Sequence, residues 1–65
     1  MDAETSCSTA LELNPGDANT RYTLGVVYQK TGRLEEALVE FQRVLEIDQL
    51  HTEAMQWAGN ISATL

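Results

Sequence analysis

Residues 24–45 read LGVVYQKTGRLEEALVEFQRVL, and the apolar pattern of this stretch decides the fold. Leu24, Val27 and Tyr28 recur at the three- and four-residue spacing of one helix face. Gly32 interrupts the pattern and suits the left-handed conformation of a residue just past a helix end. A second apolar stripe then begins. The stretch therefore predicts two helices joined by a short turn, and helices so joined pack against each other in antiparallel orientation.

The two predicted helices cover residues 18–31 and 34–47. Asp17 follows the turn sequence at residues 14–16, and its carboxylate can cap the first helix by accepting hydrogen bonds from free amides. The second helix is expected to bury one stripe, made of Leu34, Ala37, Leu38, Phe41, Val44 and Leu45. Because no segment keeps the clear apolar and polar alternation of a strand, the sequence predicts an all-α fold.

The sequence also repeats itself at an offset of 34 residues. Gly25 and Gly59 are separated by that offset, and it aligns residues 10–14, ALELN, with residues 44–48, VLEID. Thirty-four residues is the length of a helix-turn-helix unit that buries its apolar faces mainly against copies of itself. The chain is therefore expected to stack and bind rather than to catalyse a reaction.

Five residues carry a resemblance to a known family. Leu24, Gly25 and Tyr28 match the pattern W-x2-L-G-x2-Y, and Ala37 and Phe41 match the A-x3-F that follows it. On these residues the chain resembles the tetratricopeptide repeat family, and the resemblance extends over nearly the whole sequence. Arg21 departs from the pattern at the Trp position, and Ser62 departs from it at the Tyr position of the next unit.

The resemblance implies a single domain over residues 1–65, built as an antiparallel helix-turn-helix repeat of about four helices. Residues 3–13 would form the second helix of a preceding repeat, residues 18–51 a full repeat, and residues 52–64 the first helix of a following repeat. Each outer helix then lacks the partner that would cover its outer face. Either the chain belongs to a longer array, or copies of it associate through those faces.

Composition narrows the classes of partner. The chain has 65 residues, a formal net charge of −6 and a pI near 4.4. Phosphate backbones would be repelled by this charge, so no nucleic-acid partner is expected, whereas basic partners would be attracted. No apolar run is long enough to cross a membrane, and the start of the chain is polar and acidic, unlike a secretory signal. With a lone cysteine, Cys7, the sequence favours a cytoplasmic location.

No catalytic residues and no cofactor or metal site are expected. His51 is the only histidine and falls at a predicted turn, where a surface or capping role is favoured over that of a general base. Glu40 is expected on the solvated side of its helix, and Cys7 in a buried position. The sequence therefore predicts a protein that is not an enzyme, since no acid, base, nucleophile or metal set can be assembled.

The resemblance implies a concave groove, lined by the first helix of each repeat, that holds an extended peptide or a partner helix. The residues placed on it are Asn19, Tyr22, Val26, Gln29, Lys30, Glu53, Gln56 and Asn60. Some family members hold a partner's carboxylate with Lys and Asn side chains, but Tyr22 and Glu53 stand here where cations would be expected. The amide side chains are instead expected to pair with peptide backbone. Whether Tyr22 lines the groove or packs on the helix at residues 3–13 stays open.

A self-association module is the alternative function. The residues assigned to such a surface are Met55, Trp57, Ile61 and Leu65, because the end of the chain lacks a covering helix. Packing against the preceding helix is favoured for Met55. For Trp57, a position in the core and a position on an association surface both stay open. Ile61 and Leu65 are expected to be short of cover.

Overall fold

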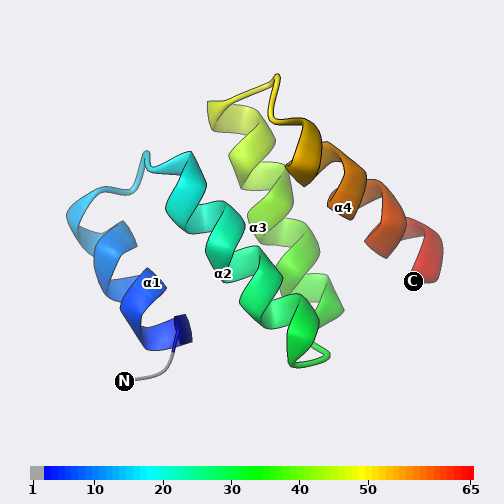
Figure 1. Ribbon diagram of the computed structural model, residues 1–65, viewed down its shortest axis with the longest axis horizontal. Helices are drawn as coiled ribbons and strands as arrows, with labels where there is room; N and C mark the ends of the chain where they lie inside the picture. The colour runs from blue at the N-terminus through cyan, green and yellow to red at the C-terminus, as the bar shows by residue number, and fades with distance from the viewer. Residues whose placement is uncertain (1–2) are drawn as a thin grey trace.

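The structure, a computed structural model, describes residues 3–65 and consists of four α-helices (Figure 1). They are α1 (Ala3–Leu13), α2 (Ala18–Lys30), α3 (Leu34–Ile47) and α4 (Thr52–Thr64). The described part of the chain contains no strand, so the predicted all-α class is confirmed. Residues 1 and 2, which the sequence assigns to the same domain, lie outside the described residues.

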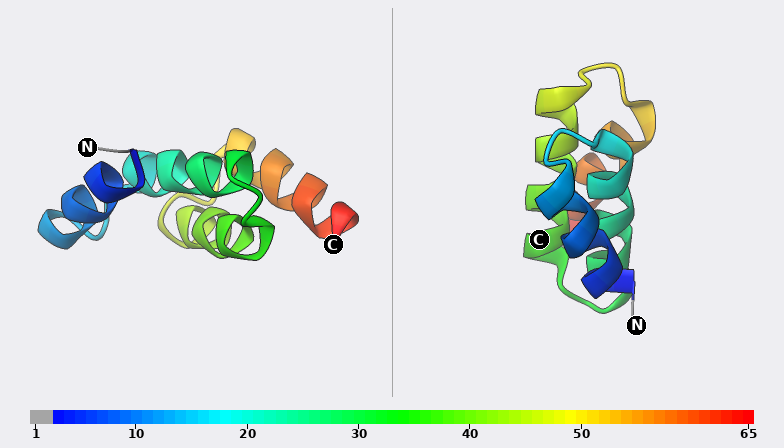
Figure 2. Two further views of the ribbon diagram at one scale, coloured as in Figure 1. Left: turned by 90° about the horizontal axis from the view of Figure 1, so that it is seen from below. Right: turned by 90° about the vertical axis from the view of Figure 1, so that its left-hand side faces the viewer.

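Helices that follow each other in sequence also lie side by side in space. α1 packs mainly on α2, α2 on α3, and α3 on α4. Figures 1 and 2 show α1 and α4 at opposite ends of the molecule, with α2 and α3 forming the central hairpin. The two central helices are thus flanked on both sides, whereas each end helix has one main neighbour.

Local sequence fixes where the central hairpin begins and turns. At the start of α2, the backbone amide of Thr20 donates to Asp17 Oδ1 at 3.2 Å, which confirms the predicted cap. After α2, Gly32 adopts a φ of 81°, and the amide of Arg33 donates back to the carbonyl of Tyr28 at 2.8 Å. This is the hydrogen-bond pattern by which a left-handed glycine closes a helix end. The chain therefore reverses direction within three residues and enters α3.

The turn before α4 is closed by His51. Its Nδ1 accepts a hydrogen bond from the amide of Ala54 at 3.1 Å, so the ring acts as the N-terminal cap of α4. The capping role predicted for this residue is confirmed. Because Nδ1 accepts, the imidazole proton sits on the other ring nitrogen in this arrangement.

The core lies between α3 and its two neighbours. Phe41 and Val44 of α3 are its largest fully buried side chains. On α4, Ala54 and Ile61 are buried against them, with Ala58 and Trp57 packed beside. The stripe formed by residues 54, 58 and 61 has the spacing of a single helix face, which explains why Ile61 is covered. The expectation that Ile61 is short of cover is therefore wrong.

α1 is held against the central hairpin by an ion pair and by a small apolar contact at Cys7. Cys7 is its only buried residue among those described, which confirms the position expected for this thiol. The guanidinium of Arg33 donates to both carboxylate oxygens of Glu4 at 2.8 Å and also bonds to Glu36. The same guanidinium lies over the ring of Tyr28, 4.4 Å from the centroid. Arg33 thus ties the first helix to the central hairpin.

The structure explains why Arg21 stands at the Trp position of the repeat pattern. Its guanidinium Nη1 donates to Glu40 Oε1 at 3.3 Å, and its Nε donates to the carbonyl of Pro15 at 3.1 Å. The side chains of Arg21 and Glu40 are only 17% and 14% exposed. The sequence had suggested that Glu40 lies on a solvated face, and this expectation is wrong. Arg21 on the adjacent helix covers the Glu40 side chain and forms an ion pair with it.

Candidate functional site

The sequence assigns eight residues of α2 and α4 to one binding surface, which we call the α2–α4 face. Its members are Asn19, Tyr22, Val26, Gln29 and Lys30 of α2, and Glu53, Gln56 and Asn60 of α4. The structure brings the two halves together at one point, where the hydroxyl of Tyr22 donates to Glu53 Oε2 at 3.0 Å. The two residues are 31 positions apart in the chain, so packing of α2 and α4 around α3 creates this contact.

Tyr22 is half-buried and packs toward α3 and α4. Its ring centroid lies 5.7 Å from that of Phe41 and 4.9 Å from that of His51, in tilted arrangements typical of aromatic pairs. It joins the partly buried residues packed against the core. The alternative that Tyr22 packs on α1 is therefore wrong, and its ring is also part of the core boundary rather than a free groove residue.

Trp57 extends this contact into a short hydrogen-bonded chain. Its Nε1 donates to the hydroxyl oxygen of Tyr22 at 3.0 Å, and that hydroxyl donates in turn to Glu53. Trp57 is half-buried and packs against the core cluster. Of the two roles left open for it, core packing is the one that the structure shows. No periodicity in the sequence signals this contact, because the two partners lie on different helices.

Burial raises the pKa of the Tyr22 phenol, and the hydrogen bond to the Glu53 carboxylate raises it further. The phenol therefore stays neutral and keeps its proton at physiological pH. As a result, the donor and acceptor of each hydrogen bond are fixed: the Trp57 indole donates to the Tyr22 hydroxyl, and this hydroxyl donates to the carboxylate of Glu53.

The other residues of the α2–α4 face remain available to a ligand. Asn19, Lys30, Gln56 and Asn60 are exposed, and Val26 and Gln29 are half-buried. Within residues 3–65, no hydrogen bond engages the side-chain amides of Asn19, Gln56 or Asn60. An amide side chain offers both a donor and an acceptor, as a peptide unit does. This face can therefore pair with the backbone of an extended segment.

The residues assigned to self-association do not form one surface. Ile61 is 3% exposed, whereas Met55 and Leu65 are 54% and 62% exposed. The sequence had favoured packing of Met55 on the preceding helix, and this expectation is wrong. Met55 is exposed because it lies one residue after Ala54, where the buried stripe of α4 begins. The exposed apolar residues at this end of the chain are therefore Met55 and Leu65.

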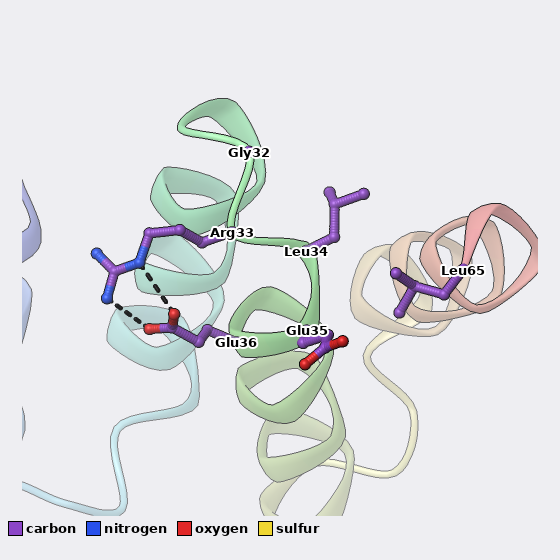
Figure 3. A pocket seen from close by; sticks show the side chains of 6 residues that line it. All are labelled: Gly32, Arg33, Leu34, Glu35, Glu36 and Leu65. Carbon is purple, nitrogen blue, oxygen red and sulfur yellow. Dashed lines mark hydrogen bonds and ion pairs between the residues drawn. The ribbon is translucent and has the colours of Figure 1, made fainter.

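A surface hollow of about 330 Å³ lies at the turn between α2 and α3, where the end of the chain approaches it (Figure 3). Its lining consists of Gly32, Arg33, Leu34, Glu35, Glu36 and Leu65. Arg33 points toward Glu36 and away from the two leucines, so its charge is already engaged there. None of the residues of the α2–α4 face lines this hollow.

The described residues contain neither a metal-binding cluster nor a helix that could span a membrane. Among the residues that the structure describes, no group of three or more His, Cys, Asp or Glu side chains could hold a metal ion. None of the four described helices has both the length and the apolar character that crossing a bilayer requires.

Comparison with known proteins adds an independent observation. A family model described as tetratricopeptide repeat matches residues 2–58. Over 46 residues, 71% of the chain, the sequence is 37% identical to a TPR repeat-containing protein of Methanocaldococcus jannaschii. Over 59 residues, 91% of the chain, it is 34% identical to an FK506-binding protein-like protein of Mus musculus. The matches cover 8% and 17% of the lengths of these two relatives.

Proposed function

The chain belongs to the tetratricopeptide repeat family, whose repeats generally mediate protein–protein interaction and are typically not catalytic, and from this premise we propose that the α2–α4 face binds an extended segment of a partner protein. The observation that carries this proposal is the set of exposed amide side chains at Asn19, Gln56 and Asn60, which no hydrogen bond within the described residues engages. Such groups favour backbone pairing, which gives affinity with little selectivity for sequence.

The partner that we propose is basic. The chain carries a net charge of −6, and Glu53 adds a carboxylate to the α2–α4 face, where it accepts a hydrogen bond from Tyr22. A field of this sign raises the encounter rate of cationic segments more than it raises their final affinity. Added salt is therefore expected to slow association while changing dissociation little. We also propose a cytoplasmic location, because the chain has a single cysteine and therefore no internal disulfide.

Peptide selection followed by substitution tests this function. Segments selected from a displayed random library for binding to the wild-type chain should bind Gln56→Ala and Asn60→Ala more weakly. Gln42→Ala is a matched control, because Gln42 is an exposed amide on α3, outside the α2–α4 face. Both test residues are exposed, so all three variants should keep the wild-type circular dichroism. Equal binding by all three variants would contradict the proposal.

Self-association is a second candidate, and Gly59 favours it. Gly25 on α2 is buried against Phe41 of α3, whereas its repeat equivalent Gly59 on α4 is exposed, and a β-carbon built there would meet no atom of another helix within 4 Å. Met55 is also exposed and lies about one helical turn before Gly59 in α4. We propose that this outer face of α4 receives either the next helix of a longer array or α1 of a second copy.

Sedimentation over a hundredfold range of concentration distinguishes self-association from groove binding alone. If copies stack through the outer face of α4, the mean mass should rise with concentration, and Gly59→Lys should suppress the rise. Gln42→Lys adds the same charge at an exposed position of α3 and would serve as the control. A mass that stays monomeric throughout would exclude self-association in the isolated chain.

A further inference from the structure

Glu53 differs from the other carboxylates that accept side-chain hydrogen bonds from another helix. Glu4 and Glu40 each accept from an arginine on a neighbouring element. Glu53 accepts from the neutral hydroxyl of Tyr22, and within residues 3–65 no Lys, Arg or His side chain pairs with it. Its negative charge is thus held in position without being neutralised.

The groups around Glu53 are of the kind that a guanidinium prefers. The carboxylate is exposed, and its Oε1 has no hydrogen-bond donor among the described residues. Tyr22 and Trp57 are half-buried, and hydrogen bonds connect the Trp57 indole and the Tyr22 hydroxyl to this carboxylate. A guanidinium is planar, donates to carboxylates through a rigid fork, and stacks on aromatic faces, whereas an ammonium is a compact and strongly hydrated charge.

We propose that Glu53, together with the rings of Tyr22 and Trp57, is a subsite for an arginine side chain of the partner segment. The carboxylate accepts the guanidinium hydrogen bonds, and the rings provide the flat surface on which its plane lies. This inference rests on the proposed binding function of the α2–α4 face. It goes beyond that function because it assigns one charged residue of the partner to one position on the face.

Trp57 provides a direct reporter for this subsite, since it is the only tryptophan of the chain. Its indole N–H donates to Tyr22, which donates to Glu53, so a cation bound at the carboxylate should perturb the single indole signal in a ¹H–¹⁵N spectrum. The probes are the peptide acetyl-Ala-Ala-Arg-Ala-Ala-amide and two counterparts, in which citrulline or lysine replaces arginine. Citrulline keeps the shape of arginine but carries no charge.

The expected result is a saturable shift of the Trp57 indole signal with the arginine peptide. Glu53→Gln should weaken this binding about 1.4-fold to fivefold, the range that corresponds to the energies measured for exposed ion pairs. Gln keeps an acceptor for the Tyr22 hydroxyl, and unchanged thermal unfolding would confirm that the fold is intact. Glu46→Gln makes the same charge change at an exposed site on α3 and should leave the affinity unchanged.

Several outcomes would overturn the arginine subsite. They are the absence of any indole shift, equal weakening by Glu53→Gln and Glu46→Gln, and binding of the citrulline or lysine peptide as tight as that of the arginine peptide. If the peptides bind equally and Asn60→Ala weakens all of them, the subsite fails while the binding function stands. If Glu53→Gln weakens the arginine peptide but Gln56→Ala and Asn60→Ala have no effect, the subsite stands and backbone pairing fails.

Discussion

Gly25 of α2 lies so close to the ring of Phe41 on α3 that a larger side chain at this position would clash with the ring. A β-carbon built on Gly25 would be 2.7 Å from Cε1 of Phe41 and 3.0 Å from two further ring atoms. The Phe41 ring is fully buried and cannot turn aside freely. The glycine therefore permits the close approach of the two helices, and this contact fixes the geometry of the central hairpin.

Gly25→Ala should destabilise the protein. The clash with Phe41 is expected to outweigh the gain in helix propensity, for a net loss of about 1–2 kcal/mol in the free energy of unfolding. Gly59→Ala is the matched control, because the same change there meets open space. It should stabilise the monomer by roughly 0.5–1 kcal/mol, the ordinary preference of a helix for alanine. Urea denaturation measures both values, and a destabilised Gly59→Ala together with a neutral Gly25→Ala would refute this account.

Removal of the His51 cap should loosen the start of α4. His51→Ala leaves the amide of Ala54 without its acceptor and is expected to cost about 1 kcal/mol of stability. His51→Asn should retain most of the wild-type stability, because Asn is a favourable capping residue with a side-chain acceptor. Thermal unfolding followed by circular dichroism compares the two variants. Equal melting temperatures for Ala and Asn would show that the cap contributes nothing.

Loss of the Arg33 side chain should free α1 from the central hairpin. Arg33→Ala removes the contacts to Glu4, Glu36 and Tyr28 together, while Cys7 remains the one buried apolar contact of α1. Amide hydrogen exchange over residues 7–11 should become faster, and exchange over residues 38–45 should change much less. Arg43→Ala is the control, because Arg43 is an exposed residue of α3 that forms no ion pair in the described part of the chain. Identical exchange in both variants would contradict the role of Arg33.

Acid should weaken the fold through two carboxylates. Hydrogen bonds from the hydroxyl and then the amide of Thr20 hold the pKa of Asp17 below its usual 3.8. The hydrogen bond from Arg33 holds the pKa of Glu36 below its usual 4.5. Because both values are lower in the folded state, these groups stabilise the fold above their unfolded pKa values, and the stabilisation is lost as pH falls through the folded ones.

The melting temperature should therefore decrease below about pH 4.5. Asp17→Asn keeps a capping acceptor that cannot titrate, so its melting temperature should decrease less over the same range. A decrease of the same size in the wild type and in Asp17→Asn would show that Asp17 does not contribute to the acid response.

The sequence predicted the elements of the fold because their signals are local. Asp17 caps α2, Gly32 closes it, and the apolar stripe of α3 is buried as its spacing indicated. Contacts between helices were harder to predict. Helix periodicity says which face a residue occupies but not which neighbour covers it, so the pairing of Arg21 with Glu40 was missed.

The candidate site was predicted in part for the same reason. The sequence placed Tyr22 and Glu53 on one face, and the structure joins them. It gave no indication that Trp57 would donate to Tyr22, because that contact depends on how far α4 is rotated about its own axis. The burial of Ile61 and the exposure of Met55 follow from the same rotation.

A chemical-shift map of the bound complex tests the central claim most directly. The isolated chain would be labelled with ¹⁵N and titrated with a segment selected for binding. Binding on the α2–α4 face predicts the largest shifts at the side-chain amides of Asn19, Gln56 and Asn60 and at the Trp57 indole. Shifts confined to Met55, Gly59 and Leu65, with these amides unchanged, would contradict the claim and place the interaction on the outer face of α4.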